Sequence, residues 1–149
     1  MKATVYYEDV QVGREIPHEV KEILTTRSIM KWAAAVKDFY EIHYDKDFAR
    51  AAGMPSVIAH GPYKLALLAR MLQEWVGEEG RLHRISCTHK ASNFPGETLV
   101  CKGKIASKYV KDGQNFIECD IWVENQDGVV CAPGKALVSV LSRGKVPNK

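Results

Sequence analysis

Two short segments of the chain carry residue types that can move a proton. The first contains Asp38 and His43, five residues apart, and the second is the tetrapeptide Ala59-His60-Gly61-Pro62. A carboxylate and an imidazole held together can orient and deprotonate a water molecule. A glycine at the start of a helix offers free backbone N–H groups to a carbonyl oxygen. These are the groups needed to add or remove water beside a carbonyl group.

The spacing of Asp38 and His43 does not by itself assign them to catalysis, because an exposed loop acid and a packed histidine would give the same pattern. One observation favours a function. Asp38 follows the predicted C-terminus of a helix, where its negative charge meets the negative end of the helix dipole. A residue at such a position is expected to serve another purpose. The histidines without motif partners are predicted to be ordinary surface or core residues: His18, His83 and His89.

Asp38 and His43 are predicted to lie in a loop between two helices. The first helix ends near Asp38, with Thr25 or Thr26 as its N-cap. Its apolar side chains recur at helical spacing: Ile29, Trp32, Ala33 and Val36. The loop that follows is predicted to contain one further helical turn around residues 47–52.

The main helix is predicted to begin at Gly61-Pro62 and to end at Gly77. Proline suits the first turn, where no N–H is needed, and glycine suits the C-cap. One face carries Leu65, Leu68, Ala69, Leu72 and Val76, and the flank carries Leu67, Met71 and Trp75. Because few polar positions remain, we expect this helix to be buried on most of its sides.

The sequence after the main helix alternates between apolar and polar residues, which is typical of strands. One strand is predicted between Arg14 and Thr25, and four follow over residues 82–90, 99–108, 117–124 and 129–141. Asp112-Gly113 and Asp127-Gly128 supply hairpin turns, and Pro133-Gly134 is predicted to form a bulge. The tail from Arg143 onwards is predicted to be frayed.

This order of elements predicts an α+β fold with a single domain, residues 1–149. A five-stranded antiparallel sheet would wrap around one long central helix. A single helix cannot cover such a sheet completely, so a sheet edge and apolar surface would remain exposed. We therefore expect a homodimer.

Composition and charge argue against several other classes of protein. The 149 residues are 46% apolar and 26% charged, as in an ordinary soluble protein. The net charge of +3 is small and scattered, which favours neither a nucleic-acid nor a membrane partner. No apolar run could span a membrane and the first residues lack a signal-peptide core, so a cytoplasmic location is expected. The four cysteines form no C-x-x-C motif, so we predict no metal site.

The spacing Asp38-x4-His43 and the step Ile58-Ala59-His60-Gly61 resemble a known family. Together with the order of elements, they are similar to the MaoC-like (R)-specific enoyl-CoA hydratases of the hot-dog fold over nearly the whole chain. Further matches to the family's pattern are Ile42, Asp45, Phe48, Ala49 and Gly53. The family's glycine, asparagine and proline are replaced here by Lys37, Tyr40 and Glu41. These replacements alter the turn but leave the acid and the imidazole in place.

The resemblance implies hydration of trans-2-enoyl thioesters, or dehydration of (R)-3-hydroxyacyl thioesters, in fatty-acid, steroid or other acyl side-chain metabolism. The carrier would be CoA or an acyl carrier protein. Asp38 and His43 would hold the water, with the carboxylate as the better acceptor of its proton, and the Gly61 N–H would polarise the thioester oxygen. His60 would shape the helix start, while Tyr40 would either pack in the core or line the acyl pocket. The acyl thioester is the one ligand implied, without a cofactor or a metal.

Two alternative functions are compatible with the sequence. Some MaoC-like chains of steroid side-chain breakdown pair with a different hot-dog chain, so this chain could be a half-active or non-catalytic acyl-binding subunit of a heteromer. Tyr40 in place of the motif asparagine suits such a divergent member. A hot-dog thioesterase is less favoured. Those enzymes place a carboxylate within the central helix, and here Glu74, near the far end, is the only one.

Overall fold

The computed structural model describes residues 5–144, and its elements follow the predicted order. They are η1 (Tyr7–Asp9), β1 (Val20–Ile23), α1 (Thr26–Val36), η2 (Glu41–His43), α2 (Lys46–Ala51), α3 (Gly61–Val76), β2 (Arg81–Cys87), β3 (Thr98–Lys111), β4 (Gln114–Glu124) and β5 (Val130–Val140), where η denotes a 3-10 helix. The long helix α3 is therefore preceded by one strand and short helices and followed by four strands.

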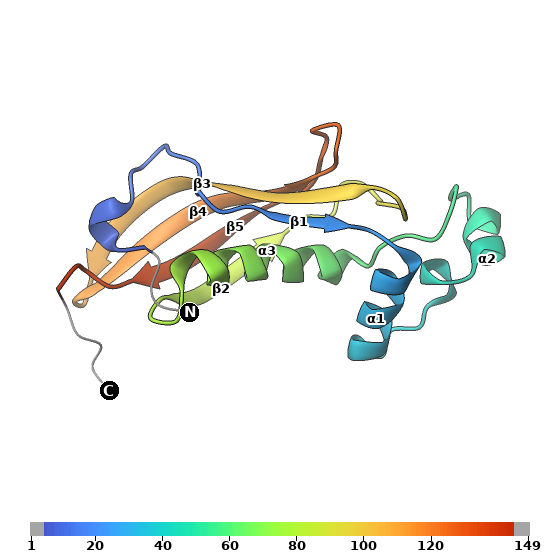
Figure 1. Cartoon of the computed structure of the whole chain (residues 1–149), viewed down its shortest axis with the longest axis horizontal. Coiled ribbons are helices and arrows are strands. Elements are labelled where there is room, and N and C mark those ends of the chain that lie inside the picture. Colours follow the sequence, from blue (N-terminus) through green and yellow to red (C-terminus); the bar gives the residue numbers. More distant parts are fainter. Residues whose placement is uncertain (1–4, 145–149) are drawn as a thin grey trace.

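The five strands form one antiparallel sheet in the order β1-β3-β4-β5-β2. Figure 1 shows this sheet curving over α3, which runs along its inner side. The predicted α+β class and the hot-dog arrangement of one sheet around one long helix are thereby confirmed. The edges of the sheet are β1 and β2, and β2 is added beside β5 at the end of the order.

The core lies between α3 and the sheet. The buried residues of α3 are Lys64, Leu67, Leu68, Met71, Leu72, Trp75 and Val76. Buried strand residues that join them in the core include Leu99, Cys101, Ile105, Ile117, Cys119, Ile121 and Val123. The strand residues alternate because successive side chains point to opposite faces of a sheet. Leu65 and Ala69, which were expected on the buried face of the helix, are only half-buried.

The elements α1, η2 and α2 lie together beyond one end of the sheet (Figure 1). The predicted cap of α1 is confirmed at Thr25, whose hydroxyl accepts the Ser28 N–H at 3.0 Å. Asp45 caps α2, because its carboxylate accepts the backbone N–H groups of Asp47 and Phe48. Such caps are important here because helices this short are unstable in water without added interactions.

The first predicted strand is shorter than expected. Only β1 continues the sheet within residues 14–25, and Glu15 forms an isolated bridge with Lys104 of β3. Pro17 lies between these two contacts and has no N–H to donate to a strand ladder. The proline therefore separates the bridge from the strand.

The bulge predicted at Pro133-Gly134 is wrong. Both residues pair regularly with β4, and the register shifts instead at Cys131. Glycine is needed at position 134 for a different reason, because a Cβ there would lie 2.0 Å from the carbonyl oxygen of Ser86 in β2. The β2 backbone thus comes too close to β5 for any side chain at this position.

The predicted hairpin turns are confirmed. Asp112 and Gly113 connect β3 to β4 with φ values of 50° and 73°. Positive φ at both positions is what a two-residue hairpin turn of the favoured hand requires. Gly128 adopts a φ of 75° between β4 and β5.

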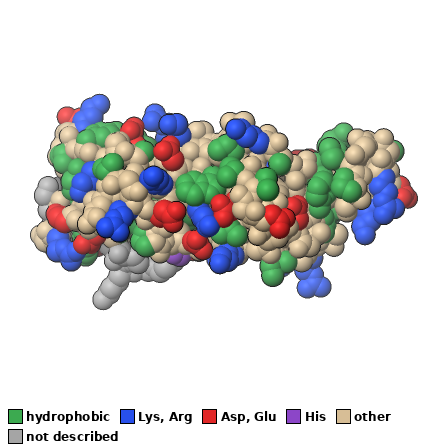
Figure 2. All heavy atoms as spheres, turned by 90° about the horizontal axis from the view of Figure 1, so that it is seen from above, with side chains coloured by type: hydrophobic (Ala, Val, Ile, Leu, Met, Phe, Trp, Pro, Cys, Tyr) green, Lys and Arg blue, Asp and Glu red, His purple; other side chains and the backbone are tan. Residues whose placement is uncertain are grey.

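The surface seen in Figure 2 carries acidic and basic side chains interspersed with one another. Within residues 5–144, no helix combines the length and the apolar character that crossing a membrane requires. Of the tail predicted to be frayed, residues 145–149 lie outside the described part of the chain. That residues 1–149 form a single domain stays a prediction.

We expect Gly134→Ala to lower the free energy of unfolding by about 1–3 kcal/mol, because the added methyl group must push β2 away from β5. Urea unfolding monitored by circular dichroism measures the change. Lys135→Ala is a matched control at the next, exposed residue and should change the free energy by less than about 0.5 kcal/mol. An unchanged unfolding midpoint for Gly134→Ala would contradict the close approach of the two strands.

Candidate active site

Asp38 lies where the chain leaves α1. Lys37 adopts the left-handed conformation with a φ of 57°, and the Asp38 N–H donates to the carbonyl of Ala33 at 3.0 Å. The Asp38 side chain is 50% exposed. Its carboxylate is therefore placed by the backbone at the negative end of α1, where the helix dipole does not stabilise its charge.

His43 closes the turn η2, and its imidazole has a fixed tautomer. Nδ1 lies 2.7 Å from the carbonyl oxygen of Ile58. Because a carbonyl oxygen can only accept, Nδ1 carries the proton, and Nε2 of the neutral ring is an acceptor. The Ile58 N–H donates in turn to the carbonyl of Ile42 at 3.2 Å. These two bonds tie the loop that contains His43 to the segment leading into α3.

His60 is the N-cap residue of α3 and is only 1% exposed. Its ring stacks on that of His43, with centroids 3.6 Å apart and planes 19° from parallel. Nε2 lies 3.2 Å from the carbonyl oxygen of Asp38 and donates to it. Burial lowers the pKa of His60 below its usual value, and the hydrogen bond to Asp38 opposes this shift. A neutral imidazole therefore joins Asp38, His43 and the start of α3.

The three side chains converge on a small volume. Asp38, His43 and His60 each offer one atom, and these atoms lie within 4.8 Å of one another. One water molecule can bridge such atoms, because each hydrogen bond spans roughly 2.8 Å. A metal ion would need lone pairs aimed at one point about 2 Å from each nitrogen, and stacked, nearly parallel rings do not provide this. The arrangement suits a bound water better than a metal ion.

Tyr40 lies at the open side of this group. Its backbone N–H donates to the Asp38 carboxylate at 3.3 Å. Its ring meets those of His43 and Phe48 edge-on, with centroids 6.2 Å and 5.6 Å away. Because Tyr40 is 52% exposed, it is not a core residue. It forms an aromatic wall beside Asp38 and His43.

Tyr63 holds α1 and β1 against the first turn of α3. Its hydroxyl donates to Glu22 of β1 at 2.8 Å, and its ring stacks on Trp32 of α1 with centroids 5.3 Å apart. Burial, assisted by Glu22, raises the pKa of Tyr63 to about 12, so the hydroxyl remains a donor. The end of α1, which carries Asp38, is thereby fixed relative to α3.

Gly61 is the first residue of α3 and Pro62 is the second. The Gly61 N–H has no acceptor inside the helix, and Pro62 has no N–H. A Cβ at position 61 would lie 2.7 Å from Cδ2 and 2.8 Å from Nε2 of His89. Glycine is therefore required for this imidazole to lie over the helix start.

Three residues near Gly61 received no role from the sequence: Lys64, His89 and Asn93. Lys64 is 2% exposed, and its amine donates to the carbonyl of Ala91 at 2.7 Å and to the side-chain oxygen of Asn93 at 3.1 Å. A lysine in a helix expected to be buried on most sides was the available signal for this cluster. His89 offered no such signal, because its contact with Gly61 joins segments far apart in the sequence.

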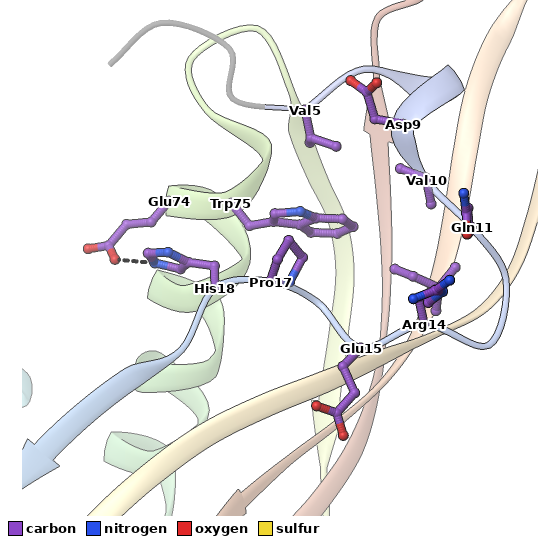
Figure 3. A pocket seen from close by; sticks show the side chains of 11 residues that line it. Val5, Asp9, Val10, Gln11, Arg14, Glu15, Pro17, His18, Glu74 and Trp75 are labelled. Carbon is purple, nitrogen blue, oxygen red and sulfur yellow. Dashed lines mark hydrogen bonds and ion pairs between the residues drawn. The ribbon is translucent and has the colours of Figure 1, made fainter.

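A cavity of about 870 Å³ lies at the other end of α3 (Figure 3). Pro17 and Trp75 form part of its wall, and His18 and Glu74, 2.8 Å apart, lie at one side. Trp75 is near the last turn of α3, so roughly 20 Å of helix separate it from Gly61. The cavity does not belong to the group around the helix start.

Sequence comparison supports the resemblance drawn from the motifs. A family model described as "MaoC like domain" matches residues 9–124. The chain belongs to this family. A relative, the fatty acid synthase subunit beta of Saccharomyces cerevisiae, is 25% identical over 129 residues, which are 85% of this chain and 6% of that protein. The corresponding Aspergillus oryzae subunit is 34% identical over 74 residues, covering 48% of this chain and 4% of its own length. The MaoC-like chain thus spans only a small part of these relatives.

Solved structures share the fold of this MaoC-like chain. The R-hydratase PhaJ1 from Pseudomonas aeruginosa, in the unliganded form, superimposes with a TM-score of 0.84 at 19% identity, covering 98% of this chain and 96% of its own. A chain of the ChsH1-ChsH2 complex from Mycobacterium tuberculosis gives a TM-score of 0.76 at 23% identity, covering 88% and 98%. Identities this low establish the fold and leave the function to the site.

We expect the stability of the protein to fall as the pH decreases below about 6.5, the usual pKa of histidine. The pKa of His60 is lowered in the folded protein, so the unfolded chain binds more protons between the folded and unfolded pKa values. The free energy of unfolding is therefore highest at pH values above the unfolded pKa, and it decreases as the pH falls from the unfolded to the folded pKa of His60. Urea unfolding across the window should show a smaller loss for His60→Asn than for wild type. Equal losses in both proteins would contradict a buried, neutral His60.

Proposed function

We propose that this MaoC-like protein adds water to trans-2-enoyl thioesters to give (R)-3-hydroxyacyl thioesters, or catalyses the reverse dehydration. The observation that carries the proposal is the convergence of Asp38, His43 and His60 within 4.8 Å at the N-terminus of α3. A helix N-terminus stabilises the negative charge that develops on a thioester oxygen during this reaction. The acid, the imidazole and the backbone amide would thus act on the same bound substrate.

The carboxylate of Asp38 is the proposed acceptor of the water's proton. His43 donates from Nδ1 to the carbonyl oxygen of Ile58. Its Nε2 is therefore the atom proposed to accept a hydrogen bond from the water and to orient it. As the water oxygen bonds to C3, the electrons of the C2=C3 bond move towards the thioester. The resulting enolate oxygen accepts a hydrogen bond from the Gly61 N–H. The proton then passes from Asp38 to C2, which restores the carboxylate and completes the addition of one water.

This scheme involves no redox cofactor, because the addition of water transfers no electrons overall. It also needs no metal ion, because the Gly61 N–H polarises the thioester oxygen and Asp38 accepts the water's proton. The acyl thioester is the proposed ligand. Its place in fatty-acid or other lipid metabolism is supported by the names of the relatives, which include fatty acid synthase subunits and an R-hydratase of the same fold. We propose CoA as the carrier from the resemblance to enoyl-CoA hydratases. Turnover of acyl-carrier-protein thioesters alone would reverse this choice.

A subunit of a heteromer is the second candidate, and the likeness to a chain of the ChsH1-ChsH2 complex supports it. The assembled pair of Asp38 and His43 favours an active subunit over a non-catalytic one. A thioesterase remains less favoured. Glu74, the carboxylate within α3, lies near the far end of the helix and bonds to Arg70 and His18.

We expect wild-type protein to elute as a homodimer in size-exclusion chromatography with light scattering at micromolar concentration. β2 is an edge strand, and an exposed edge favours pairing with another chain. Large apolar side chains are also exposed near the site, and association would cover them. They are Val36, Phe39, Tyr40, Tyr44 and Phe48. A well-behaved monomer would contradict the homodimer, and assembly only with a second hot-dog chain would support the heteromer.

Asp38→Asn and His43→Ala should each lower kcat by at least about 10²-fold, since each removes one of the groups that activate the water. The double variant should be little slower than the slower single variant, because the two groups act on one water. The assay is the loss of enoyl absorbance over a panel of trans-2-enoyl-CoA substrates of increasing length.

Asp47→Asn is the matched control for the acid, because this exposed carboxylate belongs to α2 and not to the site. It should leave kcat unchanged. Melting temperatures should stay near that of wild type for Asp38→Asn, whose side chain is half exposed. The hydratase proposal is falsified if both single variants keep near-normal rates on every substrate that wild type uses. A wild type that is inactive on the whole panel by itself would promote the heteromer.

A further inference from the structure

His89 lies over the start of α3 although no motif predicts it there. Its ring atoms Cδ2 and Nε2 come within 2.7 Å and 2.8 Å of the position that a Cβ of Gly61 would occupy. That Cβ position and the amide nitrogen of Gly61 are bonded to the same Cα. Nε2 therefore lies within a few ångströms of the amide nitrogen of Gly61, the group that we propose to contact the thioester oxygen.

Hydrogen bonds from α3 and from the residues before it hold the segment that carries His89. The buried amine of Lys64 donates to the carbonyl of Ala91 at 2.7 Å and to Asn93 Oδ1 at 3.1 Å. The carbonyl of Asn93 accepts the N–H of Ala59 at 2.9 Å, two residues before the helix starts. The loop and the helix start are thus joined both through a side chain of α3 and through the segment that leads into it.

The same segment is also fixed to the sheet. The N–H of Thr88 donates to the carbonyl of Pro133 at 2.8 Å, and the N–H of Lys90 donates to the carbonyl of Cys131 at 2.9 Å. These two bonds flank His89 on both sides. The imidazole is therefore carried by a rigid backbone, which is the condition for a preorganised hydrogen-bond donor.

The surroundings of the His89 ring are compatible with a proton on Nε2. His89 is an exposed residue, but partial desolvation, followed by the positive charge of Lys64, lowers its pKa below the usual value and so favours the neutral ring. Burial raises the pKa of the Cys87 thiol, which therefore keeps its proton. The Cys87 sulfur lies 4.0 Å from Nδ1, and a thiol that donates weakly to Nδ1 would leave the ring proton on Nε2.

We propose that His89 is a second hydrogen-bond donor to the thioester oxygen, acting through Nε2–H beside the N–H of Gly61. This proposal rests on the hydratase function proposed above. The second residue of α3 is a proline, so the helix start lacks the next N–H that could have shared the negative charge. His89 supplies the missing donor from another element. Glycine at position 61 then leaves room for the ring beside a backbone N–H that any residue except proline would carry.

Steady-state kinetics of His89→Phe and His89→Gln on a trans-2-enoyl-CoA test this role. Phenylalanine keeps a flat ring over Gly61 but has no N–H, so kcat should fall by about 10²-fold with little change in KM, since the donor acts mainly on the transition state. Glutamine places an amide N–H near the position of Nε2. The kcat of His89→Gln should therefore be at least about tenfold higher than that of His89→Phe. His83→Phe is the matched control, because His83 lies in β2 and bonds to Ser139. It should leave kcat unchanged.

The outcomes separate this inference from the function on which it rests. If wild type is active and His89→Phe retains its full kcat, His89 only packs on Gly61 and the inference is overturned. The same conclusion follows if His89→Gln is as slow as His89→Phe while both melt like wild type, because the N–H is then not what matters.

If His89→Phe does not fold, the decision rests on His89→Gln and His89→Asn. The amide nitrogen of asparagine cannot reach as far as Nε2, so this variant should be the slower of the two, and equal rates overturn the inference. A wild type that hydrates no enoyl thioester overturns the proposed function and this inference together.

Discussion

The geometry of the site depends on the burial of one imidazole. His60 gives up nearly all of its contact with water, and burying a polar ring costs free energy unless hydrogen bonds replace the lost solvent. Its bond to the carbonyl of Asp38 and its stacking on His43 offset part of this cost, while Nδ1 has no partner within residues 5–144. Because these contacts reach the end of α1 and the turn η2, one buried ring sets the relative positions of the acid, the imidazole and the helix start.

The central helix changes its character along its length. Most of α3 packs apolar side chains against the sheet, as a core helix should. Its first turn instead carries the free N–H of Gly61 and the buried amine of Lys64. A buried amine is tolerated because two oxygen atoms of the loop accept from it. The same bonds hold the loop with His89 against the helix, so the polar first turn organises the site and the apolar turns organise the fold.

The acid and the first imidazole are carried by elements that the sheet does not cover. The short helices α1 and α2 lie beyond the end of the sheet and depend on their caps and on the contacts of Tyr63 with Glu22 and Trp32. A region with few buried side chains opens at a lower free energy than the core of a domain. The carboxylate and the aromatic wall are thus the exposed, more deformable part of the site. The buried histidine and the helix start form its rigid part.

Local patterns in the sequence determined much of this protein. The cap of α1 at Thr25, the start of α3 at Gly61 and both hairpin turns depend on residues close together in the chain, so their signals are local. The glycine at position 134 was misread as a bulge, because its cause is the backbone of a neighbouring strand. Only the tertiary structure brought His89 to the helix start and gave the Lys64 amine its acceptors in the same loop. That contact joins a helix to a loop beyond the next strand, and it follows from how α3 packs on the sheet, which no local pattern of residues encodes.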